Sequence, residues 1–307
     1  AKTGYTADGK WVSDRENPQM GQKDSRFGSN IPPQKVRPDV EAMTPSSRDA
    51  GKLRWRLLNE AGRALMIPAM ILNDLAGGWI QFQFHGFGGN TKREPVTDNP
   101  HKLPRSPNDP WPGKEALVDR TSKDHTRVTD DGRPTIMNER THAWIQAQIY
   151  GTDEKEQHAL RSFEGGKMRL GADGRLPEDP AKPGIDQTGF NNNYNPQLSF
   201  LHWLFTVEHN AIAAHYRKFN PGWSDETLFQ MERKVNVALI ARTHTIQWTE
   251  DLLQHPTLQA GMHADWYGFL GPRLKDWMMR MQYRYPAFRK LTKWLTDNDV
   301  IAGMPGS

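Results

Sequence analysis

The chain has 307 residues, no cysteine, and 40 basic against 36 acidic residues, which leaves a net charge of +4. The absence of cysteine excludes disulfides, iron–sulfur clusters, cysteine-bound zinc and a thiol nucleophile. The charges are interspersed and form no basic stripe, so no nucleic-acid partner is expected. A hydrophobic content of 36% is low for a self-contained globule of this length. We therefore expect long surface arms, or a core that a partner completes.

Residues 1–50 predict an extended N-terminal arm, because they are polar and carry scattered glycine and proline. Residues 51–307 are expected to form one helical domain that residues outside this chain complete. Apolar residues recur at helical spacing from Lys52 to Ile67, with arginines between them, and predict an amphipathic helix that Pro68 ends. A basic amphipathic helix either packs on its domain or lies on a membrane surface, so peripheral membrane contact stays open.

The most informative stretch is residues 79–90, an apolar and aromatic run that reads WIQFQFHGFGGN. It predicts a helix over residues 69–84, which the glycines after His85 close. Gln81 and His85 are four residues apart, so a helix stacks them on one face, about 40° apart around its axis. An unpaired buried polar group costs about 1–3 kcal/mol, so both need polar partners. They are either hydrogen-bonded core residues or one wall of a cofactor pocket.

The middle of the chain predicts loops around one short helix. Residues 91–135 are rich in charge and proline and predict a long surface loop. Residues 152–170 predict a short helix followed by a Gly-Gly turn, and residues 173–195 predict another loop.

A long helix is predicted over residues 197–218 from its apolar periodicity. His209 lies on its apolar side. His215 is six residues further on, whereas a helical metal site needs ligands three or four residues apart. We therefore interpret His209 as a hydrogen-bonded core residue.

A second long helix is expected to begin after Ser224, a good N-cap with Glu226 close behind in the first turn. The apolar face of this helix is predicted to include Leu228, Met231, Val235 and Leu239. Residues 274–295 predict a final helix rich in Met, Trp and Tyr, which is typical of a core or a partner interface.

His244 and Thr249 are polar residues at the end of this second helix, five positions apart. On an ideal helix they lie about 140° apart. They face one site only if the helix is distorted there or one side chain reaches around it. Both are otherwise ordinary polar groups of a helix.

Four stretches follow one another in an order that resembles a known family. They are NPQMGQKDSRFGSNIP (17–32), WIQFQFH (79–85), QIYG (148–151) and residues 200–253, which include TVEHNAIAAHY and ARTHTIQWTEDLL. The family is the animal-type haem peroxidase and cyclooxygenase superfamily, and the similarity is greatest to the fatty acid alpha-dioxygenases. The resemblance implies a mainly α, haem peroxidase-like helical domain with long irregular surface arms.

The resemblance also implies the roles of four residues. Gln81 and His85 match the catalytic pair that faces the open side of haem b. His244 and Thr249 match the pair that binds the carboxylate of a fatty acid, and a charge-assisted hydrogen bond to a carboxylate is about twice as strong as a neutral one. The implied reaction is hydrogen abstraction from the fatty acid by a tyrosyl radical, followed by addition of oxygen.

The sequence departs from the family pattern at two sites. Relatives bind calcium through positions that are Gly86, Ile145 and Ala147 here. A hard cation needs several oxygen ligands, so no calcium or other metal site is expected. Peroxidases of the superfamily carry an arginine that polarises peroxide, but the sequence has none between Arg175 and Arg217. This favours an oxygenase over a peroxidase.

The family's axial haem ligand and radical lie in a Tyr-x-x-His motif, which does not occur in this sequence. We expect the C-terminal half, with this motif and an arginine that completes carboxylate binding, to come from a second chain or the rest of a longer product. No apolar run reaches 18 residues and no signal peptide is recognisable, so a soluble or peripheral protein is expected. Two alternatives are a peroxidase with a small reductant and a catalytically degenerate helical subunit that binds a partner or lipid.

Overall fold

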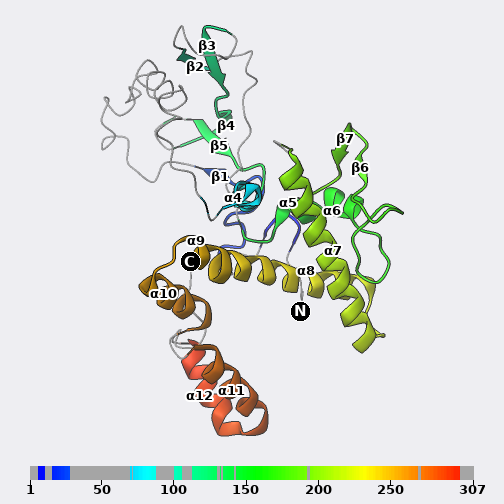
Figure 1. Cartoon of the computed structure of the whole chain (residues 1–307), viewed down its shortest axis with the longest axis vertical. Coiled ribbons are helices and arrows are strands. Elements are labelled where there is room, and N and C mark those ends of the chain that lie inside the picture. The colour runs from blue at the N-terminus through cyan, green and yellow to red at the C-terminus, as the bar shows by residue number, and fades with distance from the viewer. Residues whose placement is uncertain are drawn as a thin grey trace. The chain divides into compact units, whose positions relative to one another are not determined.

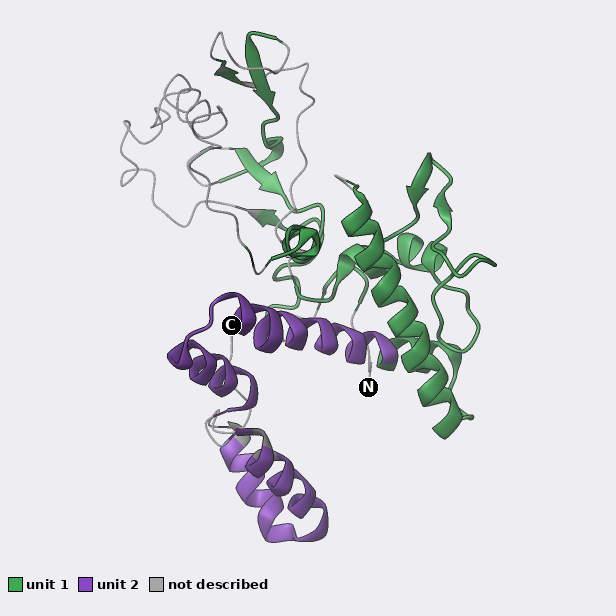
Figure 2. Cartoon of the chain, in the orientation of Figure 1, with its two compact units in different colours: residues 1–231 green, residues 232–307 purple. Residues whose placement is uncertain are grey.

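The computed structural model describes residues 6–10, 16–27, 70, 72–87, 100–105, 113–129, 132, 134–141, 143–191, 194–268 and 271–297. In this part the fold is mainly helical with short strands, as the sequence predicts (Figure 1). The chain divides into two compact units, residues 1–231 and 232–307, and the boundary falls inside helix α8 (Figure 2). The predicted amphipathic helix before Pro68 lies outside the described residues, as does most of the N-terminal arm.

Both units contain helices, and unit 2 is built mainly from them. Unit 1 contains α4 (Asp74–Phe87), α5 (Ala147–Tyr150), α6 (Glu154–Leu160), α7 (Pro196–Phe219) and the first part of α8 (Asp225–Arg242). Unit 2 contains the rest of α8, the π-helix η2 (Thr243–Trp248), α9 (Thr249–Leu252), α10 (Pro256–Tyr267), α11 (Gly271–Arg284) and α12 (Pro286–Asp297). None of the helices in the described ranges has both the length and the apolar character that crossing a bilayer requires.

The strands form three small antiparallel sheets. The largest has the order β1–β5–β4, and the other two are the pairs β2–β3 and β6–β7. Their bounds are β1 (Arg26–Phe27), β2 (His101–Pro104), β3 (Glu115–Val118), β4 (Asp124–Val128), β5 (Pro134–Met137), β6 (Glu178–Asp179) and β7 (Lys182–Asp186).

Two loop predictions are wrong. Strands β2, β3 and β4 and the start of β5 lie within residues 91–135, and β6 and β7 lie within residues 173–195. β3 and β4 are largely exposed on both faces. They therefore lack the alternation of apolar and polar residues by which a half-buried strand is recognised. Backbone pairing, rather than side-chain burial, defines these strands.

Capping side chains set where the two long helices begin. The Asn195 side chain accepts a hydrogen bond from the Leu198 amide at 2.9 Å, and Pro196 takes the first helical position of α7. Ser224 Oγ accepts from the Thr227 amide at 3.2 Å at the start of α8. Both helices therefore begin within a residue of their predicted starts.

The buried face of α8 is rotated from the one predicted. Met231, Val235 and Leu239 are only half-buried, whereas Phe229 and Ile240 are fully buried. Polar residues share this face, since Glu232, Arg233 and Asn236 are also fully buried. Apolar periodicity alone therefore misplaced the face, because the buried positions are not all apolar.

The predicted final helix over residues 274–295 is in fact two helices, α11 and α12, which meet at Tyr285 and Pro286. Proline has no amide hydrogen to donate and its ring clashes with the carbonyl four residues before it. The helix therefore ends before Pro286, which becomes the first residue of α12.

The core of unit 1 is built where α4 packs against α7. The Phe82 ring is completely buried and stacks on Phe205, with 5.5 Å between the ring centroids. Trp79 lies 5.9 Å from the same Phe205 ring. A Cβ atom at Gly78 would lie 2.6 Å from the Gln197 Cβ, so only glycine permits this close approach of the two helices.

His209 is a core residue, as predicted. Its Nε2 lies 2.9 Å from the Gly166 carbonyl oxygen and its Nδ1 lies 3.0 Å from the Tyr150 hydroxyl. Because a carbonyl only accepts, Nε2–H donates to Gly166 and Nδ1 accepts from Tyr150. Both ring nitrogens are satisfied, so His209 joins α7 to the QIYG turn.

His202 is the other fully buried histidine of α7, and it has a different environment. Its ring meets the edge of Phe82 at a centroid distance of 5.2 Å, and neither ring nitrogen has a hydrogen-bond partner in the described part of the chain. Burial, with a smaller effect of His85, lowers the pKa of His202 to about 3. His202 is therefore neutral in the folded protein at any ordinary pH.

This burial predicts a loss of stability in mild acid. Below about pH 6.5, the ordinary histidine pKa, the unfolded chain takes up a proton at His202 that the folded chain does not. The free energy of unfolding should thus fall as the pH drops from about 6.5 towards 3, with about 2 kcal/mol lost from this residue between pH 7.5 and 5.0. The free energy of unfolding of the His202→Leu variant, measured with urea at pH 7.5 and at pH 5.0, should lack this loss of about 2 kcal/mol. His215→Asn, at an exposed position of the same helix, should retain it; an equal acid loss in the parent and in His202→Leu would contradict the assignment.

Candidate functional site

Helix α4 presents three faces with different environments. Trp79 and Phe82 are buried, whereas Ile80 and Phe84 are 52% and 56% exposed. Gln81 and His85 lie between these faces and are half-buried. The structure therefore brings the two predicted site residues together at the margin between the core and an open apolar face.

Gln81 is held by the residue that caps α7. Asn195 Nδ2 donates a hydrogen bond to Gln81 Oε1 at 2.7 Å, while Asn195 Oδ1 accepts from the Leu198 amide. One side chain thus links the amide of α4 to the first turn of α7. This contact orients Gln81 before any ligand binds.

No hydrogen bond reaches the His85 ring from the described residues, and its Nδ1 is buried. The ring lies 5.8 Å from the ring of Phe190, at a tilt of 42°. Burial, and then the positive charge of Arg140, lower the pKa of His85. The imidazole is therefore neutral at neutral pH and able to accept a proton.

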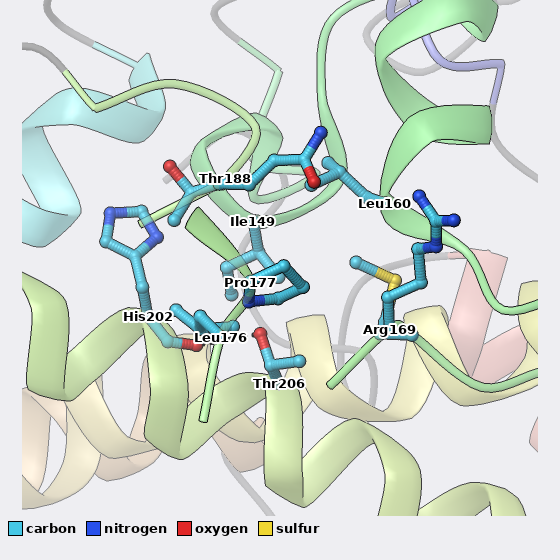
Figure 3. Close-up of a pocket in the computed structure, with 10 residues that line it drawn as sticks. Ile149, Leu160, Arg169, Leu176, Pro177, Thr188, His202 and Thr206 are labelled. Atoms are coloured by element: carbon cyan, nitrogen blue, oxygen red, sulfur yellow. Dashed lines mark hydrogen bonds between the residues drawn. The ribbon is translucent and has the colours of Figure 1, made fainter. Parts of the chain in front are cut away.

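A small cavity lies between α7 and the segment that follows β7, with His202, Thr206 and Thr188 among its lining residues (Figure 3). Its volume of about 10 Å³ is close to the minimum that holds one water molecule. The cavity is too small for a substrate. Sequence reasoning missed His202, although its place among Leu198, Leu201 and Phe205 on the apolar stripe would have indicated a buried imidazole.

His244 and Thr249 are joined by a single turn of π-helix. The Thr249 amide donates to the His244 carbonyl oxygen across five residues, and Thr249 Oγ1 donates to the same oxygen at 2.7 Å. The i→i+5 pattern stacks residues five apart, so the ideal-helix separation does not apply. Of the two geometries left open by the sequence, the structure contains the distorted helix.

The His244 ring also stacks on Trp248, with 5.2 Å between centroids and 12° between planes. Burial lowers the pKa of His244. Gln81 and His85 belong to unit 1, whereas His244 and Thr249 belong to unit 2. The four predicted site residues therefore form two pairs, each with its own local geometry.

Ile145 and Ala147, two of the positions that the resemblance matches to calcium ligands, are fully buried. Gln148 Nε2 donates to the Phe82 carbonyl oxygen at 3.2 Å, which attaches this segment to α4 through an amide. No cluster of three or more potential metal-ligating side chains occurs among the described residues. That the protein lacks calcium stays a prediction.

A model of the animal haem peroxidase family matches residues 5–290. The curated protein alpha-dioxygenase 2 of Arabidopsis thaliana is 32% identical over 272 residues, which are 88% of this chain and 41% of the relative. A crystal structure of Oryza sativa fatty acid alpha-dioxygenase is 31% identical with a TM-score of 0.73. The match covers 89% of this chain and 43% of the rice chain. A variant of the same rice enzyme, crystallised with palmitic acid, is 29% identical with a TM-score of 0.72. The match covers 90% of this chain and 43% of the variant's chain.

The chain thus spans about two fifths of the length of these relatives. The family model, by contrast, covers nearly all of this chain, including α4, both long helices and the π-turn. The chain belongs to the animal haem peroxidase family.

Proposed function

We propose that this chain forms the distal-haem part of a haem-dependent fatty acid oxygenase of the alpha-dioxygenase type. The observation that carries the proposal is the His85 imidazole, which has no hydrogen-bond partner among the described residues and stands beside an open apolar face. The family is a haem family, and the relatives are named for fatty acid oxygenation.

The residues around His85 fit a haem. Ile80 and Phe84 are exposed on the face of α4 next to it, and apolar side chains of this kind suit a flat apolar macrocycle. When bound, haem b would supply the redox-active iron for the oxidation of substrate. His85 and Gln81 are the groups of this chain that would face it.

The two side chains have separate tasks in this proposal. His85, held neutral, accepts a proton at its ring nitrogen from a peroxide that binds beside it. Gln81, oriented by Asn195, fixes the position of the peroxide by hydrogen bonding. The proton transfer and the positioning therefore come from one turn of α4.

The π-turn is the proposed anchor for the fatty acid carboxylate. Its geometry allows His244 and Thr249 to act on the same group. Thr249 exchanges its hydrogen bond to the His244 carbonyl for one to the carboxylate, which is charge-assisted and so stronger. One solved relative carries palmitic acid, which is a ligand of this class.

The axial histidine, the tyrosine that forms the radical and the arginine that completes carboxylate binding are proposed to come from the part of the fold that this chain does not contain. The chain corresponds to about two fifths of the relatives. Tests of activity therefore use the complete protein or assembly.

His85→Ala in the complete protein should lower oxygen uptake with a long-chain fatty acid by about 10²- to 10⁴-fold, since a general base is removed. The Soret absorption of bound haem should persist, because the iron is held from the other side. His215→Asn, an exposed histidine, serves as the control. Oxygen uptake by His85→Ala equal to that of the parent would contradict the assignment of His85 to the site. If the parent oxidises a guaiacol-type reductant with peroxide and without fatty acid, the protein is a peroxidase. If the parent has no Soret band, the chain is a degenerate subunit.

Thr249→Val should raise the KM for fatty acid about 10- to 100-fold with little change in kcat, because a hydrogen bond to a charged group is worth about 1.5–3 kcal/mol. Thr249→Ser keeps the hydroxyl and should restore the KM. Thr257→Val, at an exposed position of α10, is the matched control. If Thr249→Val binds fatty acid as well as the parent, the carboxylate assignment fails.

A further inference from the structure

Arg140 and His85 both contact the aromatic ring of Phe190. The Arg140 Cζ atom is 3.9 Å from the centroid of the Phe190 ring, within the range of a cation–π contact. The His85 ring lies 5.8 Å from the same centroid. Two residues that are 55 positions apart in the sequence are thus brought together through Phe190.

The charge of Arg140 is not neutralised locally. No ion pair or hydrogen bond of its side chain occurs within the described ranges, and its Nη1 is buried. Burial, the largest effect, lowers the pKa of Arg140, and three carboxylates raise it, those of Glu156, Glu139 and Asp153. Glu156 also accepts from the Thr152 amide and hydroxyl, both at 2.7 Å, and Asp153 pairs with Lys23 at 2.7 Å. A guanidinium does not lose its proton in a protein, so the Arg140 side chain stays positively charged beside the Phe190 ring.

The backbone holds Phe190 in this place. A Cβ atom at Gly189 would lie 2.1 Å from the Ala147 carbonyl oxygen, so residue 189 must be glycine for its segment to pack against α5. The Phe190 side chain is itself buried. The aromatic ring between Arg140 and His85 therefore has little freedom to move away.

We propose that Arg140 is a positioning residue for His85: across the Phe190 ring it supplies a fixed positive charge that keeps the imidazole uncharged and ready to accept a proton. The role of His85 as a proton acceptor in catalysis rests on the proposed function. The effect of Arg140 on the charge of His85 does not. No arginine lies between Arg175 and Arg217, which includes the stretch that leads into α7. Arg140 lies ahead of α5 instead.

The other charged groups near this cluster leave Arg140 as the acting charge. His202, which faces His85 from α7, is neutral because burial lowers its pKa to about 3. On the segment that carries Phe190, Asp186 accepts from Ser199 and Tyr194, and Lys182 donates to Asn191 at 2.8 Å. Among the described residues, the charge that acts on the pKa of His85 is that of Arg140.

The test is a pH titration of His85 by NMR in the full chain, labelled at histidine and prepared without haem, with the His85 signal assigned from a His85→Gln variant. Arg140→Gln should move the titration midpoint of His85 to higher pH. Arg140→Lys keeps a positive charge and should bring the midpoint back towards the parent value. Arg169→Gln, which removes an exposed arginine that donates to the Ala159 carbonyl oxygen, should leave the midpoint unchanged.

An unchanged His85 midpoint in a folded Arg140→Gln variant overturns the proposal, and so does an equal upward shift in Arg140→Lys. A measurement on the parent stands independently of how the variants fold, because the titration midpoint of His85 must lie below the ordinary histidine pKa of about 6.5. A midpoint at or above that value overturns the proposal. In the complete haem-loaded protein, the acid limb of the pH–rate profile should move to higher pH in Arg140→Gln. A shifted NMR midpoint without any oxygen uptake would support the Arg140 link and reject the proposed function.

Discussion

The packing of α4 on α7 is the contact on which the rest of unit 1 depends. Burial of the Phe82 and Trp79 rings against Phe205 fixes the rotation of α4 about its axis. Full burial of one large apolar side chain contributes about 1.5–3 kcal/mol, so this rotation is strongly preferred. This rotation of α4 places Gln81 and His85 on the flank of the helix, between its buried face and its exposed face. Gly78 permits the close approach, and Asn195 then ties Gln81 to the start of α7.

Three histidines of unit 1 show how environment assigns different chemistry to the same side chain. His209 has a partner for each nitrogen and joins two segments of the core. His202 has none within the described residues and is kept neutral mainly by burial. His85 is only half-buried, and it also lies near a cation. Of the three, His85 combines access from outside with a neutral ring, which is what a proton acceptor requires.

The π-turn in unit 2 solves a spacing problem that an α-helix cannot. Residues five apart diverge on an α-helix, whereas in the π-turn the Thr249 amide donates to the His244 carbonyl oxygen. Such single turns are rare and frequently lie at functional sites, since they sacrifice regular hydrogen bonding. Here the Thr249 hydroxyl satisfies the His244 carbonyl oxygen a second time and supports the distortion.

The sequence by itself determined the elements whose signals are local: the capped starts of α7 and α8, the helix that carries Gln81 and His85, and the core role of His209. For His244 and Thr249 to face one site, the spacing of five residues also required a distorted helix or a side chain that reaches around it, because spacing and helix geometry are both local. It did not reveal the exposed strands between residues 101 and 137, because their hydrogen bonds leave no pattern of burial in the side chains. The break between α11 and α12 also has a local signal, because Pro286 cannot continue the preceding helix, although apolar periodicity alone predicts one helix. Only the tertiary structure decided that α8 buries polar residues, that His202 has no partner within the described core, and that Arg140 reaches Phe190 and His85. Such contacts join residues far apart along the chain, and their geometry follows from how helices and loops pack, which no local spacing encodes.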